Sequence, residues 1–159
     1  MRAIAFVGAM WLAACSRPVV PTVSAQSVVV TRVDANGIGL DVVLSANNSN
    51  SVDLKLAEVT SHLVFDKTND VGTVSVPKAM VLPAGKTTEV DVQVAMPWKD
   101  VGTLAPLAAL GHPVAYSVDG TASLGGVLDS VRVPFHAEGS IPVADIVRAT
   151  VRALPALHF

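Results

Sequence analysis

The stretch from Ile38 to Leu56 constrains the fold most, because two runs of alternating apolar residues flank a cluster of turn-forming residues. Successive side chains of a strand point to opposite faces, so such alternation predicts an extended chain with one apolar face. Only Val43 breaks the alternation of the first run. The cluster at 47–51 contains only Asn and Ser, whose side chains hydrogen-bond to nearby backbone and favour a turn. The stretch therefore predicts a strand, a corner and a second strand.

The composition of the chain favours a single β-rich domain. A length of 159 residues suits one domain, and 51% of the residues are hydrophobic while only 4% are aromatic. The core must therefore consist mostly of Val, Leu, Ile and Ala, and valine favours strands. A formal net charge of −2 provides no basic surface to neutralise phosphates, so we expect no binding of nucleic acid.

The amino terminus has the order of an export signal. Arg2 is followed by an apolar stretch, residues 3–12, and then by the sequence Leu-Ala-Ala-Cys that ends at Cys15. A membrane-spanning helix needs about twenty apolar residues, so this shorter stretch is better explained as a removable signal peptide, residues 1–14. The four residues that end at Cys15 resemble a bacterial lipobox, which implies cleavage before the cysteine and acylation of its sulfur.

Acylation would make Cys15 a membrane anchor, since two or three acyl chains together bind stably. The resemblance to a lipobox further implies, from Ser16 rather than Asp after the cysteine, the outer membrane where the host has two. The alternative is that Cys15 is an ordinary buried thiol. It is the sole cysteine, so no intrachain disulfide can form. Residues 15–26 are expected to be the lipidated cysteine and an extended tether that begins the mature chain.

Six strands are expected besides the one that opens the central stretch. One precedes it as its hairpin partner, and five follow it, the first of them beginning inside the stretch. Pro77 cannot donate to a ladder, which predicts an edge strand or a break there. The sequence Asp-Ala-Asn-Gly at 34–37 favours a tight hairpin between the first two strands. The expected strands outside the opening run are Ser27–Val33, Val52–Phe65, Val71–Leu82, Thr88–Met96, His112–Asp119 and Val127–Glu138.

Two segments change to helical spacing. Residues 97–111 predict a short connecting helix that ends at Gly111. Residues 142–159 predict an amphipathic helix, whose apolar stripe includes Val143, Ile146 and Val147. Three roles are open for that apolar stripe: it packs on the sheets, it lies on a membrane surface, or it binds a partner protein. The expected fold is mainly β, an antiparallel sandwich of about seven strands with one short helix between strands five and six and a carboxy-terminal helix.

No sequence pattern indicates catalytic, cofactor-binding or metal-binding residues. Its histidines lack ligand spacing, and Glu89 and Asp91 share a strand face that solubility explains. No serine lies in a nucleophile elbow, and no glycine-rich loop joins a strand to a helix. Asn47, Asn48 and Asn50 are explained by turn geometry, although a polar loop that contacts a ligand is the alternative. The four histidines are His62, His112, His136 and His158.

Several ordered segments resemble the late-embryogenesis-abundant type 2 family, also described by its water-stress and hypersensitive-response domain. The match extends from about Ser27 to Ile141. The matching segments are Gly39–Leu44 with Asn47–Asn50, Leu82–Val90, Tyr116–Gly120, and Arg132–Phe135 with Gly139. The resemblance implies an immunoglobulin-like or fibronectin-like sandwich that protects proteins or membranes during desiccation, without catalytic residues. Asn48 stands where the family typically has proline, which predicts a looser corner.

These observations predict a non-enzymatic lipoprotein that faces the periplasm from the outer membrane. Its partners would be the membrane, through acylated Cys15, and envelope proteins or stress-damaged clients. The alternative is a structural or assembly subunit that docks into an envelope complex through a sheet edge or the carboxy-terminal helix.

Overall fold

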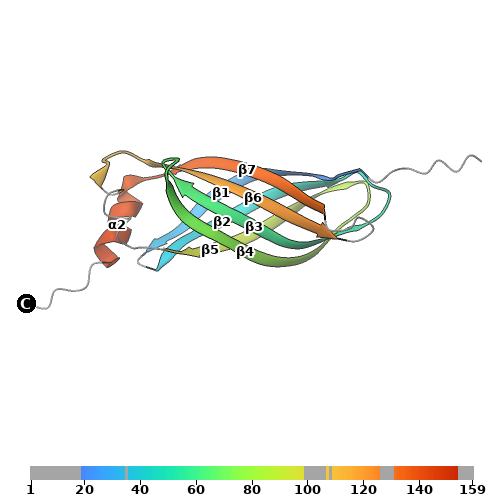
Figure 1. Ribbon diagram of the computed structural model, residues 1–159, viewed down its shortest axis with the longest axis horizontal. Coiled ribbons are helices and arrows are strands. Elements are labelled where there is room, and N and C mark those ends of the chain that lie inside the picture. Colours follow the sequence, from blue (N-terminus) through green and yellow to red (C-terminus); the bar gives the residue numbers. More distant parts are fainter. Residues whose placement is uncertain (1–18, 35, 99–106, 108, 126–130, 154–159) are drawn as a thin grey trace, which may run out of the picture.

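The computed structural model describes residues 19–34, 36–98, 107, 109–125 and 131–153, which form two antiparallel sheets packed face to face (Figure 1). One sheet has the order β1-β2-β5 and the other the order β4-β3-β6-β7. The strands are β1 (Thr22–Asp34), β2 (Gly37–Asn48), β3 (Leu54–Phe65), β4 (Asn69–Leu82), β5 (Lys86–Pro97), β6 (Val114–Gly125) and β7 (Val131–Ile141). The predicted mainly β sandwich is confirmed, while its finer likeness to immunoglobulin or fibronectin domains stays a prediction.

The core lies between the inner faces of the two sheets, as the alternation predicts. On β5, the side chains of Val90, Val92 and Val94 are buried, while Asp91 and Gln93 between them and Glu89 before them are exposed. Burial of one such apolar side chain stabilises the fold by about 1.5–3 kcal/mol. The buried face of β2 comprises Ile38, Leu40, Val42, Leu44 and Ala46.

The outer strands of the two sheets lie alongside one another. β1 runs beside β7, and β5 runs beside β4, so the sandwich is nearly closed on both sides (Figure 1). Pro77 lies on β4, an edge strand of its sheet, as its missing N–H predicts. Opposite Pro77, the pairing of β3 is interrupted by a bulge between Leu56 and Glu58.

The first strand begins earlier than the sequence indicates. β1 starts at Thr22, which pairs with Asn47 of β2, so residues 22–26 are not part of a tether. Val23 and Ala25 alternate within this segment and pack against the core. The expected tether to residue 26 is therefore wrong in its last five residues, because pairing with the long β2 satisfies their backbone groups. The β1–β2 hairpin itself is confirmed by the pairing of Asp34 with Gly37.

The sixth strand is also longer than expected. The expected strand ends at Asp119, yet Gly120 and Leu124 also lie within β6. Gly120 pairs with Phe135 of β7, and a Cβ at this position would collide with the ring of Phe135. Glycine is present there to make room for an aromatic side chain, which a local sequence pattern does not reveal. β3, β4 and β5 differ from their expected ends by at most two residues.

The carboxy-terminal helix, α2 (Val143–Ala153), lies at the end of the sandwich where β1 and β2 meet in their hairpin (Figure 1). Its residue Ile146 is fully buried in the core, which decides that the apolar stripe packs on the sandwich at this position. Most of the other predicted helix, residues 97–111, lies outside the described residues. Of that segment, Leu107 is buried and Gly111 has a φ of 68°, the left-handed conformation expected where a helix ends.

Candidate functional site: the two ends of the sandwich

Cys15, the one predicted modification site, lies outside the described residues, as does His158. The other histidines lie apart from one another on the surface. His62 contacts Asp70 at 3.0 Å, and the Nδ1 atom of His112 lies 3.0 Å from the carbonyl oxygen of Pro113. Among the residues that the structure describes, no group of three or more His, Cys, Asp or Glu side chains is arranged to hold a metal ion.

His136 makes the densest charged contacts on the outer face of the four-stranded sheet. Its Nδ1 atom lies 2.7 Å from a carboxylate oxygen of Asp119, and its Nε2 atom lies 3.4 Å from Glu138. The hydrogen bond to Asp119, followed by the one to Glu138, raises the pKa of His136 above its ordinary value of 6.5. All three side chains are more than half exposed, so this cluster is a solvated surface network.

The asparagine corner, residues Asn48–Asn50, lies at the end of the sandwich opposite to α2. The side chain of Asn48 is fully buried, and its amide group donates hydrogen bonds to three carbonyl oxygens. The acceptors are those of Val52 and Leu82, both at 2.9 Å, and of Pro83 at 3.3 Å. Asn48 therefore joins the β2–β3 corner to the end of β4, two segments more than thirty residues apart.

Asn50 continues this network toward the amino terminus. Its Oδ1 atom accepts the N–H of Val19 at 2.7 Å, and its Nδ2 atom donates to the carbonyl oxygen of Val19 at 2.8 Å. The same Nδ2 atom contacts the side-chain oxygen of Asn48 at 3.1 Å. The amide of Asn50 thus binds the backbone of Val19 as a neighbouring strand would, and we call this pair of bonds the Asn50 clamp.

The corner is tied more firmly than the sequence predicts. Asn48 replaces the expected proline, yet its three acceptors and the bond from the N–H of Gly85 to the carbonyl oxygen of Asn50, at 2.9 Å, fix the surrounding turns. The expectation of a looser corner is wrong, because one buried amide satisfies several backbone groups at once. Sequence analysis missed Val19 altogether, since nothing local marks an exposed valine as the partner of a residue 31 positions away.

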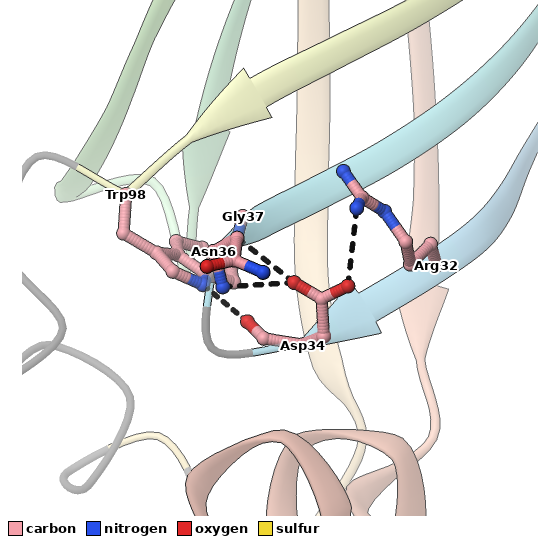
Figure 2. A network of polar contacts seen from close by, with 5 residues as sticks. All are labelled: Arg32, Asp34, Asn36, Gly37 and Trp98. Atoms are coloured by element: carbon pink, nitrogen blue, oxygen red, sulfur yellow. Dashed lines mark hydrogen bonds and ion pairs between the residues drawn. The ribbon is translucent and has the colours of Figure 1, made fainter. Parts of the chain in front are cut away.

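At the opposite end of the sandwich, both the carboxylate and the backbone carbonyl of Asp34 make the contacts that hold the β1–β2 hairpin (Figure 2). One carboxylate oxygen of Asp34 accepts the N–H groups of Asn36 and Gly37, at 2.8 and 3.2 Å, and the other contacts Arg32 at 3.2 Å. The indole of Trp98 donates to the carbonyl oxygen of Asp34 at 2.7 Å. Trp98 thereby ties the end of β5 to the β1–β2 hairpin.

The outer faces of the sheets carry shallow hollows. One of 480 Å³ follows β3 and β4 near the asparagine corner and is lined by Lys55 and by apolar residues that include Met80 and Val81. Another of 470 Å³ lies over Gly39, between Arg32 and Gln93. Across the described ranges, no helix has the length and apolarity needed to span a membrane.

The sequence profile of the late embryogenesis abundant protein family, LEA_2, matches residues 43–139, which is more than half of the chain. The chain belongs to this family. The matched segment lies within the residues on which the sequence resemblance rests, and it contains the asparagine corner and Tyr116. A search of curated proteins gives no significant match.

Solved structures of a candidate late embryogenesis abundant (LEA) protein and of other proteins share this fold. An Arabidopsis thaliana protein solved in solution superposes with a TM-score of 0.62 and 18% identity, over 76% of this chain and 80% of its own. A candidate late embryogenesis abundant (LEA) protein gives 0.60 and 17% over 77% and 71%, and an Archaeoglobus fulgidus protein gives 0.58 and 11% over 74% and 96%. At these identities the likeness concerns the fold.

Proposed function

We propose that this LEA type 2 protein is a non-enzymatic, lipid-anchored domain of the cell envelope that protects proteins or membranes under stress such as desiccation. Membership of the LEA family, from the match over residues 43–139, is the observation that carries this proposal. The membrane anchor would be Cys15, which follows a signal-like stretch. The exposed polar strand faces, for example that of Glu89 and Asp91, suit a domain that must stay soluble near damaged clients.

Protection is tested by drying. The mature domain is mixed with an enzyme that aggregates on desiccation, and light scattering after rehydration is compared with that of the enzyme alone and with albumin at equal mass. The proposal expects less aggregation than albumin allows. Protection equal to or below that of albumin contradicts a specific role.

The anchor is tested separately by intact mass and membrane fractionation of the protein expressed in a bacterium, beside a Cys15→Ala variant. Loss of residues 1–14, a gain of acyl mass and sedimentation with membranes are expected for the wild type alone. Equal solubility and equal unmodified mass for both proteins would remove the anchor from the proposal.

A second function, docking into an envelope complex, is favoured by one observation on α2. Val147 is 41% exposed although its neighbour Ile146 is fully buried, so the helix offers an apolar residue outside the core. Removing the whole helix would also remove Ile146 from the core, so a point variant is the sharper test. Val147→Lys is expected to keep the fold and to abolish co-purification of an envelope partner. Unchanged co-purification would argue against docking through α2.

A further inference from the structure

We propose that the asparagine-corner end of the sandwich faces the lipid bilayer and touches it, and that the Asn50 clamp sets the distance. This inference rests on the proposed acylation of Cys15. The membrane-facing surface, which we call the corner surface, consists of Val19, Val20, Val52 and Val81 together with Lys55 and Lys86.

The clamp shortens the connection between the anchor and the domain. Because Asn50 binds both the N–H and the carbonyl of Val19, the chain is held from that residue, three residues before β1 begins at Thr22. The four residue steps from Cys15 to Val19 span at most about 14 Å when fully extended. A strand of twelve residues, such as β2, is about 40 Å long.

These two lengths decide the orientation. The start of β1 and the asparagine corner lie at one end of the sandwich, and α2 lies at the other (Figure 1). A connection of about 14 Å cannot pass along the whole sandwich. The α2 end therefore cannot rest on the bilayer in place of the corner end while Cys15 remains in the membrane.

The exposed apolar side chains gather at the same end. Among the residues that the structure describes, seven large hydrophobic side chains are exposed, and four of them belong to the corner surface. Their exposed fractions are 55% for Val19, 59% for Val20, 38% for Val52 and 50% for Val81. Val52 adjoins the corner because its carbonyl accepts from Asn48, and Val81 is the last residue but one of β4.

The charges at this end suit an anionic lipid surface. Lys55 pairs with Val81 across the β3–β4 ladder, and Lys86 begins β5 beside the turn at 83–85; both side chains are exposed. Asp53 lies there as well and accepts the N–H of Ala84 at 2.9 Å; its carboxylate keeps its negative charge, so the two lysines leave a net charge of +1 among these three residues. Apolar residues bordered by lysines are the composition of surfaces that lie at the bilayer interface. Four valines bind weakly alone, so the anchor would supply the effective concentration that keeps them in contact.

The orientation can be measured by quenching of tryptophan fluorescence. The chain from Cys15 onward retains every strand and every buried core residue, so it is expressed without the leader and joined through the Cys15 thiol to a maleimide lipid. The vesicles contain phosphatidylcholine with brominated acyl chains and phosphatidylglycerol. Trp98 is the sole tryptophan from Cys15 onward, since Trp11 belongs to the removed segment, and it is replaced by Phe. Val52→Trp then reports on the corner surface, and Val147→Trp reports on α2; the two valines are similarly exposed, 38% and 41%.

The proposal expects the fraction of fluorescence quenched to be about threefold greater for Val52→Trp than for Val147→Trp, because interfacial side chains lie only 5–10 Å deep. Equal quenching at the two positions, or stronger quenching at Val147→Trp, would overturn it. Asn50→Ala should lower the quenching of Val52→Trp by releasing Val19. A Gly-Ser insertion of six residues between Ser16 and Arg17 lengthens the connection and leaves the sandwich untouched. It should also lower the quenching of Val52→Trp. Unchanged quenching with that insertion would overturn the role of the short connection.

Chemical coupling makes this result independent of acylation in the cell. If the quenching pattern holds but the intact mass shows no acyl group, the proposed anchor fails and the corner surface stands as a membrane-binding surface. If acylation is found but quenching is equal at both ends, the anchor stands and the proposed orientation fails.

Discussion

The hydroxyl of Tyr116 donates a hydrogen bond to the carbonyl oxygen of Val28 at 3.0 Å and thereby joins the two sheets of the sandwich. Tyr116 belongs to β6 and Val28 to β1, so the bond crosses the side of the sandwich where β1 runs beside β7. Burial raises the pKa of the Tyr116 phenol above its ordinary value of 10.0. The phenol also occupies the space over Gly139, where a Cβ would collide with it.

Replacement of Tyr116 by Phe should lower the free energy of unfolding by about 1 kcal/mol, because the ring is kept and one hydrogen bond is lost. Urea denaturation of both proteins measures the difference. Thr60→Val is a useful control, since it removes an exposed hydrogen bond to Ser75 on the outer face and should cost less. A Tyr116→Phe variant as stable as the wild type would show that the bond to Val28 does not hold the sheets together.

Replacement of Asn48 by Ala should be more costly. The carbonyl oxygens of Val52, Leu82 and Pro83 would lose a common donor inside the corner, and we expect a loss of about 2–3 kcal/mol. Asn47 is the matched control, because it is the same residue type one position earlier but its side chain is exposed. Asn47→Ala should change stability by less than about 0.5 kcal/mol. Equal effects in thermal or urea unfolding would contradict the assigned role of the buried amide.

Replacement of Gly120 by Ala should destabilise the fold by about 1–3 kcal/mol, because the added methyl group would displace the ring of Phe135. Gly125 lies in the same strand but has no atom within 4 Å of an added Cβ. Gly125→Ala should therefore be close to neutral. Differential scanning calorimetry of the two variants measures the contrast, and similar melting temperatures would indicate that the Phe135 ring can move aside.

The titration of His136 should reveal its two carboxylate neighbours. Its pKa in the folded protein is raised above 6.5, so its favourable contribution is fully present below pH 6.5 and is lost as the pH rises through the folded-state value. The effect on stability should be small because the groups are exposed. Asp119→Asn should lower the pKa of His136 more than Glu138→Gln, because the bond to Asp119 is the larger cause. NMR titration of the ring protons measures both shifts, and the reverse order would contradict the 2.7 Å geometry.

In β3, the alternation of apolar and polar residues predicts which side chains point into the core except where a bulge interrupts it. Lys55 and Glu58 both lie outside the core of the sandwich, although a spacing of three places residues on opposite faces of a regular strand. The bulge between Leu56 and Glu58 resolves this conflict by placing one extra residue, Ala57, in β3 relative to β6, so that Val59, Leu63 and Phe65 after the bulge point inward. The polar residues indicated which face is exposed to water, but the position of the bulge is seen only in the pairing with β6, where Leu56 pairs with Leu124 and Glu58 with Ser123.

The sequence by itself determined the mainly β sandwich, the turn at the asparagines, the inward faces of β2 and β5, and the edge position of Pro77. Each of these depends on residues near one another in the chain, where side-chain alternation and missing backbone donors act locally. Only the tertiary structure decided that Thr22 begins a strand, that Gly120 makes room for Phe135, and that Asn50 holds Val19. These contacts join residues far apart in sequence, and each depends on the shape of a space that exists only once both sheets have packed.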